Sequence, residues 1–225
     1  MTEAEWLACI DPTEMMYVSG EQGRLTERRD RYFSCACCRR IWHLLTDEAS
    51  RTAVRVAEQY LDGLATIEDL DTAYRAAEVH GGFAASAAAA AAFPRRELGN
   101  NGIDVAAYAT NAVVYADPHF FSGEADWGRA GRAEQSAQAD LLRDIMGNPF
   151  RPAPRVDPMV LAWNAGTVVK LAQTIYDERR FGDLPILADA LEEAGCTDAD
   201  ILSHCRSDGE HVRGCWVIDL LLGKS

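Results

Sequence analysis

Residues 33–45 read FSCACCRRIWHLL, with three cysteines in four positions close to a tryptophan and a histidine. At about 100° per residue, the apolar side chains and the cysteines cover an arc of roughly 200° on a helix, interrupted by Ser34. Arg39, Arg40 and His43 occupy the remaining side. A helix that is apolar over more than half of its circumference lies at the centre of a bundle, so this stretch predicts an all-α fold.

Helix start signals recur on both sides of this stretch. Thr2 and Glu5 have the spacing of a capping box, and Pro12 fits the first turn of a second helix. Thr26 predicts a long helix that runs through Leu45. Further starts are expected at Asp47, Thr66, Glu134, Asn164, Pro185, Thr197 and about Val212. Strand signals hardly appear, so the sequence predicts an irregular multi-helix bundle.

A proline-rich segment, NPFRPAPRVDP at residues 148–158, holds four of the eight prolines of the chain. Proline fixes the backbone and removes an amide donor, so this density predicts an extended connector. We therefore expect an N-terminal helical lobe at residues 1–147 and a C-terminal helical lobe at residues 159–225.

The segment at residues 83–131 gives weaker signals. The alanine-rich stretch at 84–92 favours either a helix packed closely against a neighbour or a low-complexity connector. Glycine and asparagine at 95–103, and glycine with aromatic residues at 117–131, are typical of loops.

Composition excludes several classes of protein. The 225 residues include 48% hydrophobic ones, which is enough for a sizeable core. The net charge of −13 repels nucleic-acid phosphates and argues against general nucleic-acid binding. No apolar run approaches the roughly 20 residues that span a bilayer. Seven cysteines, an odd number, and no leader-like opening predict a reducing, cytoplasmic setting.

The cysteines have two interpretations. Buried thiols behave as small hydrophobic side chains, which favours packing without a metal or other cofactor. The alternative is a zinc site in which Cys35 and Cys38 share an ion with Cys205, His211 and Cys215. His211 and Cys215 are four residues apart, which places them on one face of a helix. A redox role for the clustered cysteines is disfavoured, because apolar burial raises the pKa of a thiol.

The motifs of common enzymes are missing from the sequence. It contains no GxxxxGK[ST], GxGxxG, GxSxG or HExxH, so no catalytic or cofactor-binding residue is assigned. An enzyme remains an alternative hypothesis. Its pocket would lie at the junction of the two lobes, with His204, His211 and Asp208 near a polar turn.

Four blocks carry a resemblance to known sequences: MTEAEWLACIDP, FSCACCRRIWHLLTDEASRTAVRVAEQYLDG, AEQSAQADLLRDIMGNPFRP and IYDERRFGDLPILADALEEAGCTDADILSHCRSDGEHVRGCWVIDLLLGK. Together they resemble a paralogous family of uncharacterised proteins from planctomycete (Gemmata-type) bacteria. The phrase LPILADALEEAG is similar to one in planctomycete repeat-companion proteins. The resemblance implies a bacterial, cytoplasmic setting and no particular reaction, and residues 83–131 depart from it.

The last predicted helix suggests a function. Between residues 212 and 222, apolar side chains fall on nearly every side, and only Arg213 and Asp219 interrupt them. Such a helix is either the centre of the fold or part of an interface. We therefore expect a helical protein–protein interaction or adaptor module with a protein partner or self-association. The alternatives are a structural zinc-binding protein and the enzyme described above.

Overall fold

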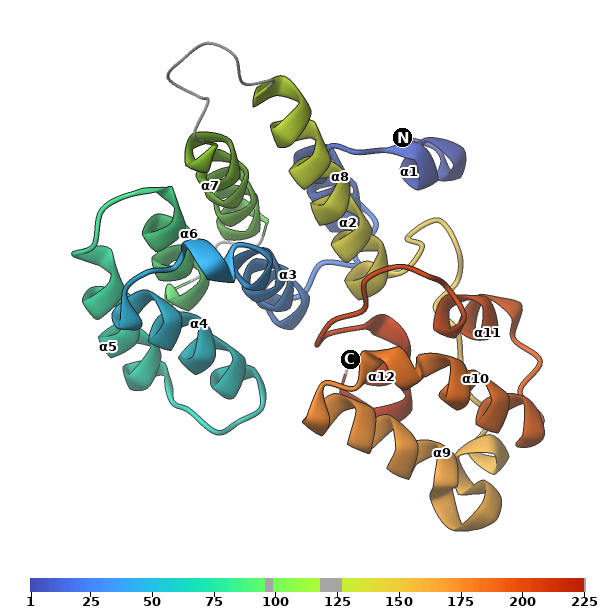
Figure 1. Ribbon diagram of the computed structural model, residues 1–225. Helices are drawn as coiled ribbons and strands as arrows, with labels where there is room; N and C mark the ends of the chain where they lie inside the picture. Colours follow the sequence, from blue (N-terminus) through green and yellow to red (C-terminus); the bar gives the residue numbers. More distant parts are fainter. Residues whose placement is uncertain (96–98, 118–126, 225) are drawn as a thin grey trace.

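The computed structural model describes residues 1–95, 99–117 and 127–224, and within these ranges its regular structure is helical throughout (Figure 1). The prediction of an all-α fold is therefore confirmed. Its elements are α1 (Glu3–Ala8), α2 (Pro12–Glu21), α3 (Glu27–Arg40), η1 (Trp42–Leu44), α4 (Glu48–Leu61), α5 (Ile67–Glu78), α6 (Phe83–Ala92), α7 (Asn100–Ala116), α8 (Trp127–Met146), α9 (Pro158–Glu178), η3 (Phe181–Asp183), α10 (Leu184–Glu193), α11 (Ala199–Cys205) and α12 (Trp216–Leu222). Among the described helices, none is both long enough and apolar enough to cross a membrane.

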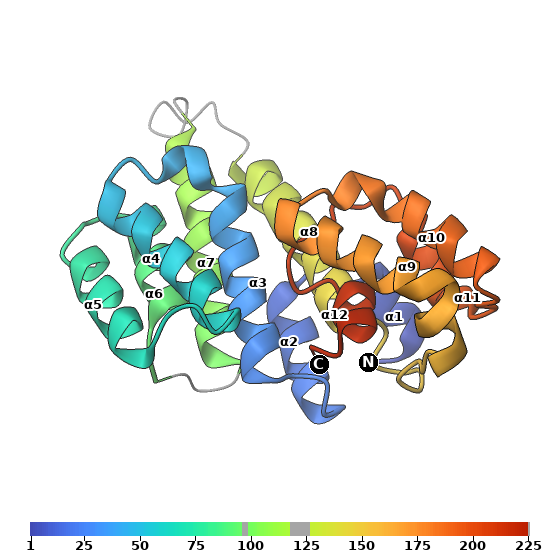
Figure 2. The ribbon, with the colours of Figure 1, turned by 90° about the horizontal axis from the view of Figure 1, so that it is seen from below.

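Helix α3 lies at the centre of the N-terminal half, where it packs against α4, α6, α7 and α8 (Figure 2). Its side chains Phe33, Cys35, Cys37 and Cys38 are buried. The predicted capping residue Thr26 accepts a hydrogen bond from the Arg29 amide and begins the helix. Helix α3 therefore lies at the centre of the bundle, as its apolar arc predicts.

Helix α3 ends at Arg40, earlier than the predicted end at Leu45. Ile41 leaves the helical conformation, and the short helix η1 follows it. This turn brings Leu45 back into the core. It also places the Arg39 guanidinium over the Trp42 ring, with Cζ of Arg39 4.2 Å from the ring centroid. The stacking and the burial of Leu45 offset the hydrogen bonds that a longer helix would have made.

The alanine-rich stretch forms helix α6, which packs against α4, α5 and α7. Its small side chains let these helices approach one another closely. The loop expected at 95–103 is wrong from residue 100 onward, because α7 begins at Asn100. A Cβ atom on Gly102 would lie 2.7 Å from Cε of Met16, so this glycine serves a close helix contact and not a loop. Residues 96–98 lie outside the described ranges.

The second expected loop, at 117–131, is also wrong in part. Helix α8 already begins at Trp127, seven residues before the predicted start at Glu134. Gly131 is buried within this helix, and a Cβ atom there would lie 3.4 Å from Cγ2 of Val114 on α7. This glycine therefore lies in the contact between α7 and α8. Residues 118–126 lie outside the described ranges.

Buried apolar side chains form two clusters, one drawn from residues 6–146 and the other from residues 160–221. Between them, residues 147–157 form the non-helical connector. The helix predicted to start at Asn164 begins earlier, at Pro158, but it is interrupted at Trp163–Gly166, where the backbone is not helical. We call the two halves the N-terminal lobe and the C-terminal lobe.

The last helix begins at Trp216 and not at about Val212, so residues 206–215 precede it as a non-helical segment. Gly214 has a φ of +91°, which belongs to the left-handed region and ends any helix before it. Val217, Ile218 and Leu221 are buried, so α12 packs inside the fold. The sequence predicts that this helix lies either at the centre of the fold or at an interface. The burial of these three side chains agrees with the first position.

Polar pairs join the two lobes around α12 and the preceding segment. The Tyr32 and Tyr176 hydroxyl groups lie 2.5 Å apart. Several ion pairs also cross the junction, among them Arg28–Asp219 at 3.0 Å, Arg40–Glu210 at 2.7 Å and Arg213–Asp62 at 2.7 Å. The lobes therefore meet through buried and half-buried polar groups.

Glu58 of α4 provides a test of this junction. Its carboxylate pairs with Arg39 at 2.6 Å and with Arg179 of the C-terminal lobe. Burial raises the pKa of Glu58, but hydrogen bonds and charge from Arg39 and then Arg179 outweigh it and hold the pKa below its ordinary value of 4.5. A carboxyl whose folded pKa is depressed stabilises the fold above its unfolded pKa, and this stability is lost as the pH falls through the folded value.

We therefore expect Glu58→Gln to lower the free energy of unfolding by about 1–3 kcal/mol at pH 7. The difference from wild type should shrink as the pH falls below about 4, where both proteins carry a neutral side chain. Urea unfolding at pH 7 and pH 3.5 measures both values. The exposed Glu48, which pairs with Arg55, supplies the control Glu48→Gln, which should change stability by less than about 0.5 kcal/mol. Equal stability of Glu58→Gln and wild type at pH 7 would contradict this account.

Candidate metal centre

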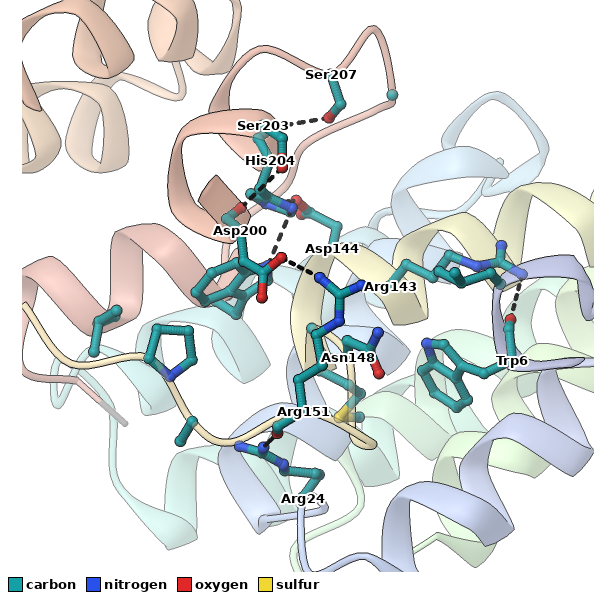
Figure 3. Close-up of a pocket in the computed structure, with 18 of the residues that line it drawn as sticks. Trp6, Arg24, Arg143, Asp144, Asn148, Arg151, Asp200, Ser203, His204 and Ser207 are labelled. Atoms are coloured by element: carbon teal, nitrogen blue, oxygen red, sulfur yellow. Dashed lines mark hydrogen bonds and ion pairs between the residues drawn. The ribbon is translucent and has the colours of Figure 1, made fainter. Parts of the chain in front are cut away.

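Four side chains from separate segments converge where the two lobes meet. Asp144 comes from α8, His204 from α11, His211 from the segment before α12, and Cys215 from the N-cap position of α12. One ligand atom from each lies within 4.8 Å of the other three. Figure 3 shows Asp144 and His204 side by side at one end of a pocket.

The Asp144 carboxylate is the centre of this cluster, with only 3% of its side chain exposed. Its Oδ1 lies 2.6 Å from Nδ1 of His211 and 3.1 Å from Nε2 of His204. Its Oδ2 accepts a hydrogen bond from the Val212 amide at 2.9 Å. The carboxylate of the N-terminal lobe is thus held by three donors of the C-terminal lobe.

His204 connects the carboxylate to the thiol. Its Nε2 lies 3.2 Å from Sγ of Cys215 as well as 3.1 Å from Asp144. The Trp216 indole N–H donates to Nδ1 of the same ring at 3.1 Å. Because an indole can only donate, Nδ1 is the acceptor, and in the neutral ring the proton sits on Nε2.

The charges of the cluster follow from these contacts. Burial raises the pKa of Asp144, but hydrogen bonds and charge from His204 and His211 outweigh it, so its pKa is lowered. Burial lowers the pKa of His211, but Asp144 outweighs this, and the net pKa is raised. Burial also raises the pKa of the Cys215 thiol well above its ordinary value. Without a metal, the cluster consists of a carboxylate, two imidazoles that contact it and a neutral thiol.

Only half of this cluster is predicted as a metal site from the sequence. The zinc alternative includes His211 and Cys215, His204 belongs only to the enzyme alternative, and Asp144 belongs to neither. A signal for Asp144 was present, because this aspartate lies on α8 between Leu142 and Ile145, both of which are buried. A carboxylate within an apolar helical run costs free energy unless it has partners, so such a residue indicates a polar site.

The remaining candidates lie elsewhere. Cys35 and Cys38 are buried in the core of the N-terminal lobe, and Cys205 is buried in that of the C-terminal lobe. Burial, followed by nearby negative groups, raises the pKa of Cys205 to about 12. None of these three belongs to the ligand cluster found among the described residues. Asp208, named for the enzyme alternative, is exposed and also lies outside the cluster.

The predicted geometry of His211 and Cys215 needs a correction. They do not share a helix face, because α12 starts only after Cys215. They meet instead because the segment at 206–215 turns back toward α8, where Val212 donates its amide to Asp144. The four-residue spacing therefore indicates the pair that the structure brings together, but the two residues are not on a helix as predicted.

The three cysteines of α3 give a prediction that separates packing from metal binding. Replacing Cys35, Cys37 and Cys38 together by alanine removes three buried sulfur atoms and leaves small cavities. The expected loss in free energy of unfolding is about 1–3 kcal/mol in total, and the serine version should lose more because each hydroxyl needs a partner. Urea unfolding measures both losses. Loss of a bound metal from the alanine variant would contradict the assignment of these residues to packing.

A cysteine beside a histidine also raises the question of nucleophilic catalysis. A catalytic thiol needs a base on one ring nitrogen and an orienting group on the other. Here Nε2 of His204 faces both Asp144 and Cys215, while Nδ1 accepts from Trp216. The thiol is also fully buried and its pKa is raised. This arrangement does not activate a nucleophile, whereas convergent ligand atoms are what a metal ion requires.

The cluster borders a cavity of about 670 Å³ between α1, α8, the connector and α11. Asp144, His204 and His211 line this cavity, and the half-buried Trp216 forms an apolar part of its wall. Its volume lies in the usual range for small-molecule sites. Comparison of the chain with models of protein families, with curated proteins and with solved structures finds no match.

Proposed function

We propose that the protein binds one divalent ion of the zinc class at the junction of its two lobes, and that this ion supports a small-molecule pocket beside it. The observation that supports the proposal is the convergence of one oxygen, two nitrogens and one sulfur within 4.8 Å. Asp144, His204, His211 and Cys215 are the proposed ligands. Aspartate, histidine and cysteine are all ordinary zinc ligands.

The distances suit a tetrahedral site after small movements. Zinc bonds of about 2.0–2.3 Å place neighbouring ligand atoms roughly 3.3–3.8 Å apart. The contacts from Asp144 to the histidines, at 2.6 and 3.1 Å, and from His204 to Cys215, at 3.2 Å, are somewhat shorter. An ion in their midst would take the place of the protons that these contacts share and would push the ligands slightly outward.

The surroundings of the two imidazoles would help to hold such an ion. The Ser207 hydroxyl donates to the His204 carbonyl and lies 3.2 Å from Nε2 of His211, where it can accept the ring proton. His211 is thereby oriented to offer Nδ1 as the ligand. His204 would bind through Nε2 and carry its proton on Nδ1, so the Trp216 indole would turn away from that nitrogen.

Four protein ligands make a closed site, which is the structural type of zinc site. One ligand belongs to the N-terminal lobe and three belong to the C-terminal lobe, so the ion would act as a clamp between them. Its binding free energy would add to the stability of the junction. It would also fix the wall of the cavity that Asp144, His204 and His211 form.

Titration with cobalt(II) tests the ligand set directly, because a tetrahedral cobalt–thiolate site absorbs strongly in the near-ultraviolet and visible range. We expect saturation near one equivalent in the wild type. Cys215→Ser should lose the thiolate charge-transfer band, whereas Cys205→Ser, which changes an equally buried cysteine outside the cluster, should keep it. A spectrum typical of octahedral, thiolate-free cobalt in the wild type would contradict the proposal.

The adaptor hypothesis stays a prediction with less support. The last helix, which suggested it, has Val217, Ile218 and Leu221 inside the fold. Large exposed apolar side chains such as Leu64, Val79 and Met159 are present, but they lie on separate segments. Single exposed apolar residues are common on monomeric proteins and do not by themselves define an interface.

A further inference from the structure

The cavity beside the proposed metal centre is unusually rich in arginine for a chain with a net charge of −13. The arginines that line it are Arg24, Arg29, Arg143, Arg151 and Arg155. A strongly acidic protein repels small anions over most of its surface. Arginines gathered in one cavity therefore call for a specific explanation, which begins with their partners.

Each acidic residue of the cavity wall already has an arginine or histidine partner. Asp140 pairs with Arg143 at 2.8 Å, Asp200 pairs with Arg151, and Glu210 pairs with Arg40 at 2.7 Å. The fourth, Asp144, is held by the two histidines. No acidic group of the wall is thus left to neutralise further arginines.

Arg24 and Arg29 have no carboxylate within ion-pair distance in the described part of the chain, and both are half-buried. Arg24 donates to the carbonyl of Arg151, and Arg29 donates to the carbonyl of Arg24 at 2.8 Å. Burial and then the neighbouring Arg24 charge lower the pKa of Arg29, and the more distant Asp219 offsets this only in part. Two guanidinium groups that repel each other at a cavity wall form a place for an anion.

We propose that this cavity binds a small molecule with an oxyanion group, phosphate or carboxylate, which Arg24 and Arg29 hold. A guanidinium has five N–H donors in a planar fork that matches two oxygen atoms of such a group. Each of these arginines has donors left after its bond to a backbone carbonyl. Trp216 and Leu220, which are half-buried and line the cavity, provide an apolar wall for the body of the ligand.

The position of Arg24 in the pocket sets the direction in which the ligand would extend. Figure 3 shows Arg24 at the far end of the pocket from Asp144 and His204, with Arg151 and Asn148 between them. A ligand held by its oxyanion at Arg24 would extend toward the metal centre. The inference rests on the small-molecule pocket of the proposed function, but neither arginine is among the proposed metal ligands, so it does not depend on the metal ion.

Phenyl phosphate, benzoate and the uncharged benzyl alcohol are suitable probes, because they share a ring and differ in the group offered to the arginines. Binding is measured by tryptophan fluorescence and by calorimetry, with chelator-treated and zinc-loaded protein. We expect saturable binding of phenyl phosphate or benzoate with a Kd of about 1 mM or tighter, and none of benzyl alcohol. The stronger of the two oxyanions identifies the headgroup.

The double variant Arg24→Gln, Arg29→Gln should weaken this binding about ten-fold or more, since hydrogen bonds to charged groups are lost. Arg75→Gln removes the same kind of charge from α5, where Arg75 is 73% exposed, and should change the Kd less than two-fold. If the double variant fails to fold by circular dichroism, Arg29→Gln alone should still weaken binding by several-fold.

Two outcomes would overturn the anion site. One is oxyanion binding that is unchanged in the arginine variants, and the other is no binding to either form of the wild type. Arginine-dependent binding to chelator-treated protein that takes up no zinc would instead support the anion site and reject the metal centre. Zinc binding without oxyanion binding would support the metal centre and reject the anion site.

Discussion

Replacing Gly214 by alanine is expected to destabilise the protein by about 3 kcal/mol or more, the largest loss that we predict for a single methyl group. Gly214 has a φ of +91°, and a Cβ atom there would lie 2.7 Å from both Cβ and Cγ of Tyr32. Tyr32 is 1% exposed on the central helix α3, and its hydroxyl group lies 2.5 Å from that of Tyr176. It has no free space to move into, so the lobes would have to separate.

Gly195 provides a matched control for backbone strain. Its φ of +90° is almost the same, but a Cβ atom there would meet nothing within 4 Å. Gly195→Ala should therefore cost only the strain of a left-handed alanine, about 1–2 kcal/mol. Urea unfolding of both variants and of the wild type measures the difference. Equal losses for the two variants would show that the contact with Tyr32 is not important for the junction.

Asp144→Ala is expected to cost about 3–5 kcal/mol, because it leaves buried donors without their acceptor. The imidazole of His211, the Nε2 proton of His204 and the Val212 amide all lose the carboxylate that they contact in the wild type. The loss should be present even without metal, since these contacts exist in the protein alone. In zinc-loaded protein the loss should be larger, because the variant lacks one of the four ligands.

Asp140→Ala is the control on the same helix, one turn earlier. The Asp140 side chain is 60% exposed and pairs with Arg143. Exposed ion pairs contribute little, so its loss should stay below about 1 kcal/mol. The comparison is made by thermal and urea unfolding with and without zinc. If Asp144→Ala were as stable as Asp140→Ala, the buried carboxylate would not hold the lobes together.

Much of the fold could be predicted because its signals are local. The apolar arc around Cys37 identified the central helix, and the caps at Thr2, Thr26, Asp47 and Thr66 all accept the predicted hydrogen bonds. Helix ends were predicted less well, since tertiary contacts set them. Gly102 looked like a loop residue because the close approach of Met16 is not visible in the local sequence.

The candidate site was harder to predict because its members lie far apart in the chain. Asp144 and His211 are 67 residues apart, and only the packing of the lobes brings them within 2.6 Å. Cysteine spacing drew attention to Cys35 and Cys38, which lie inside the first core. A buried carboxylate on an apolar helical face was the better signal, because it requires partners whatever they are. The resemblance to planctomycete proteins stays a prediction.

Metal analysis of the purified, untagged protein tests the central claim most directly. We predict about one equivalent of zinc in the wild type. Cys215→Ser and His204→Ala should lose it, while Cys205→Ser should retain it. Wild-type protein that contains no zinc above the buffer blank, both as purified and after incubation with zinc followed by gel filtration, would contradict the assignment of Asp144, His204, His211 and Cys215 as a metal centre.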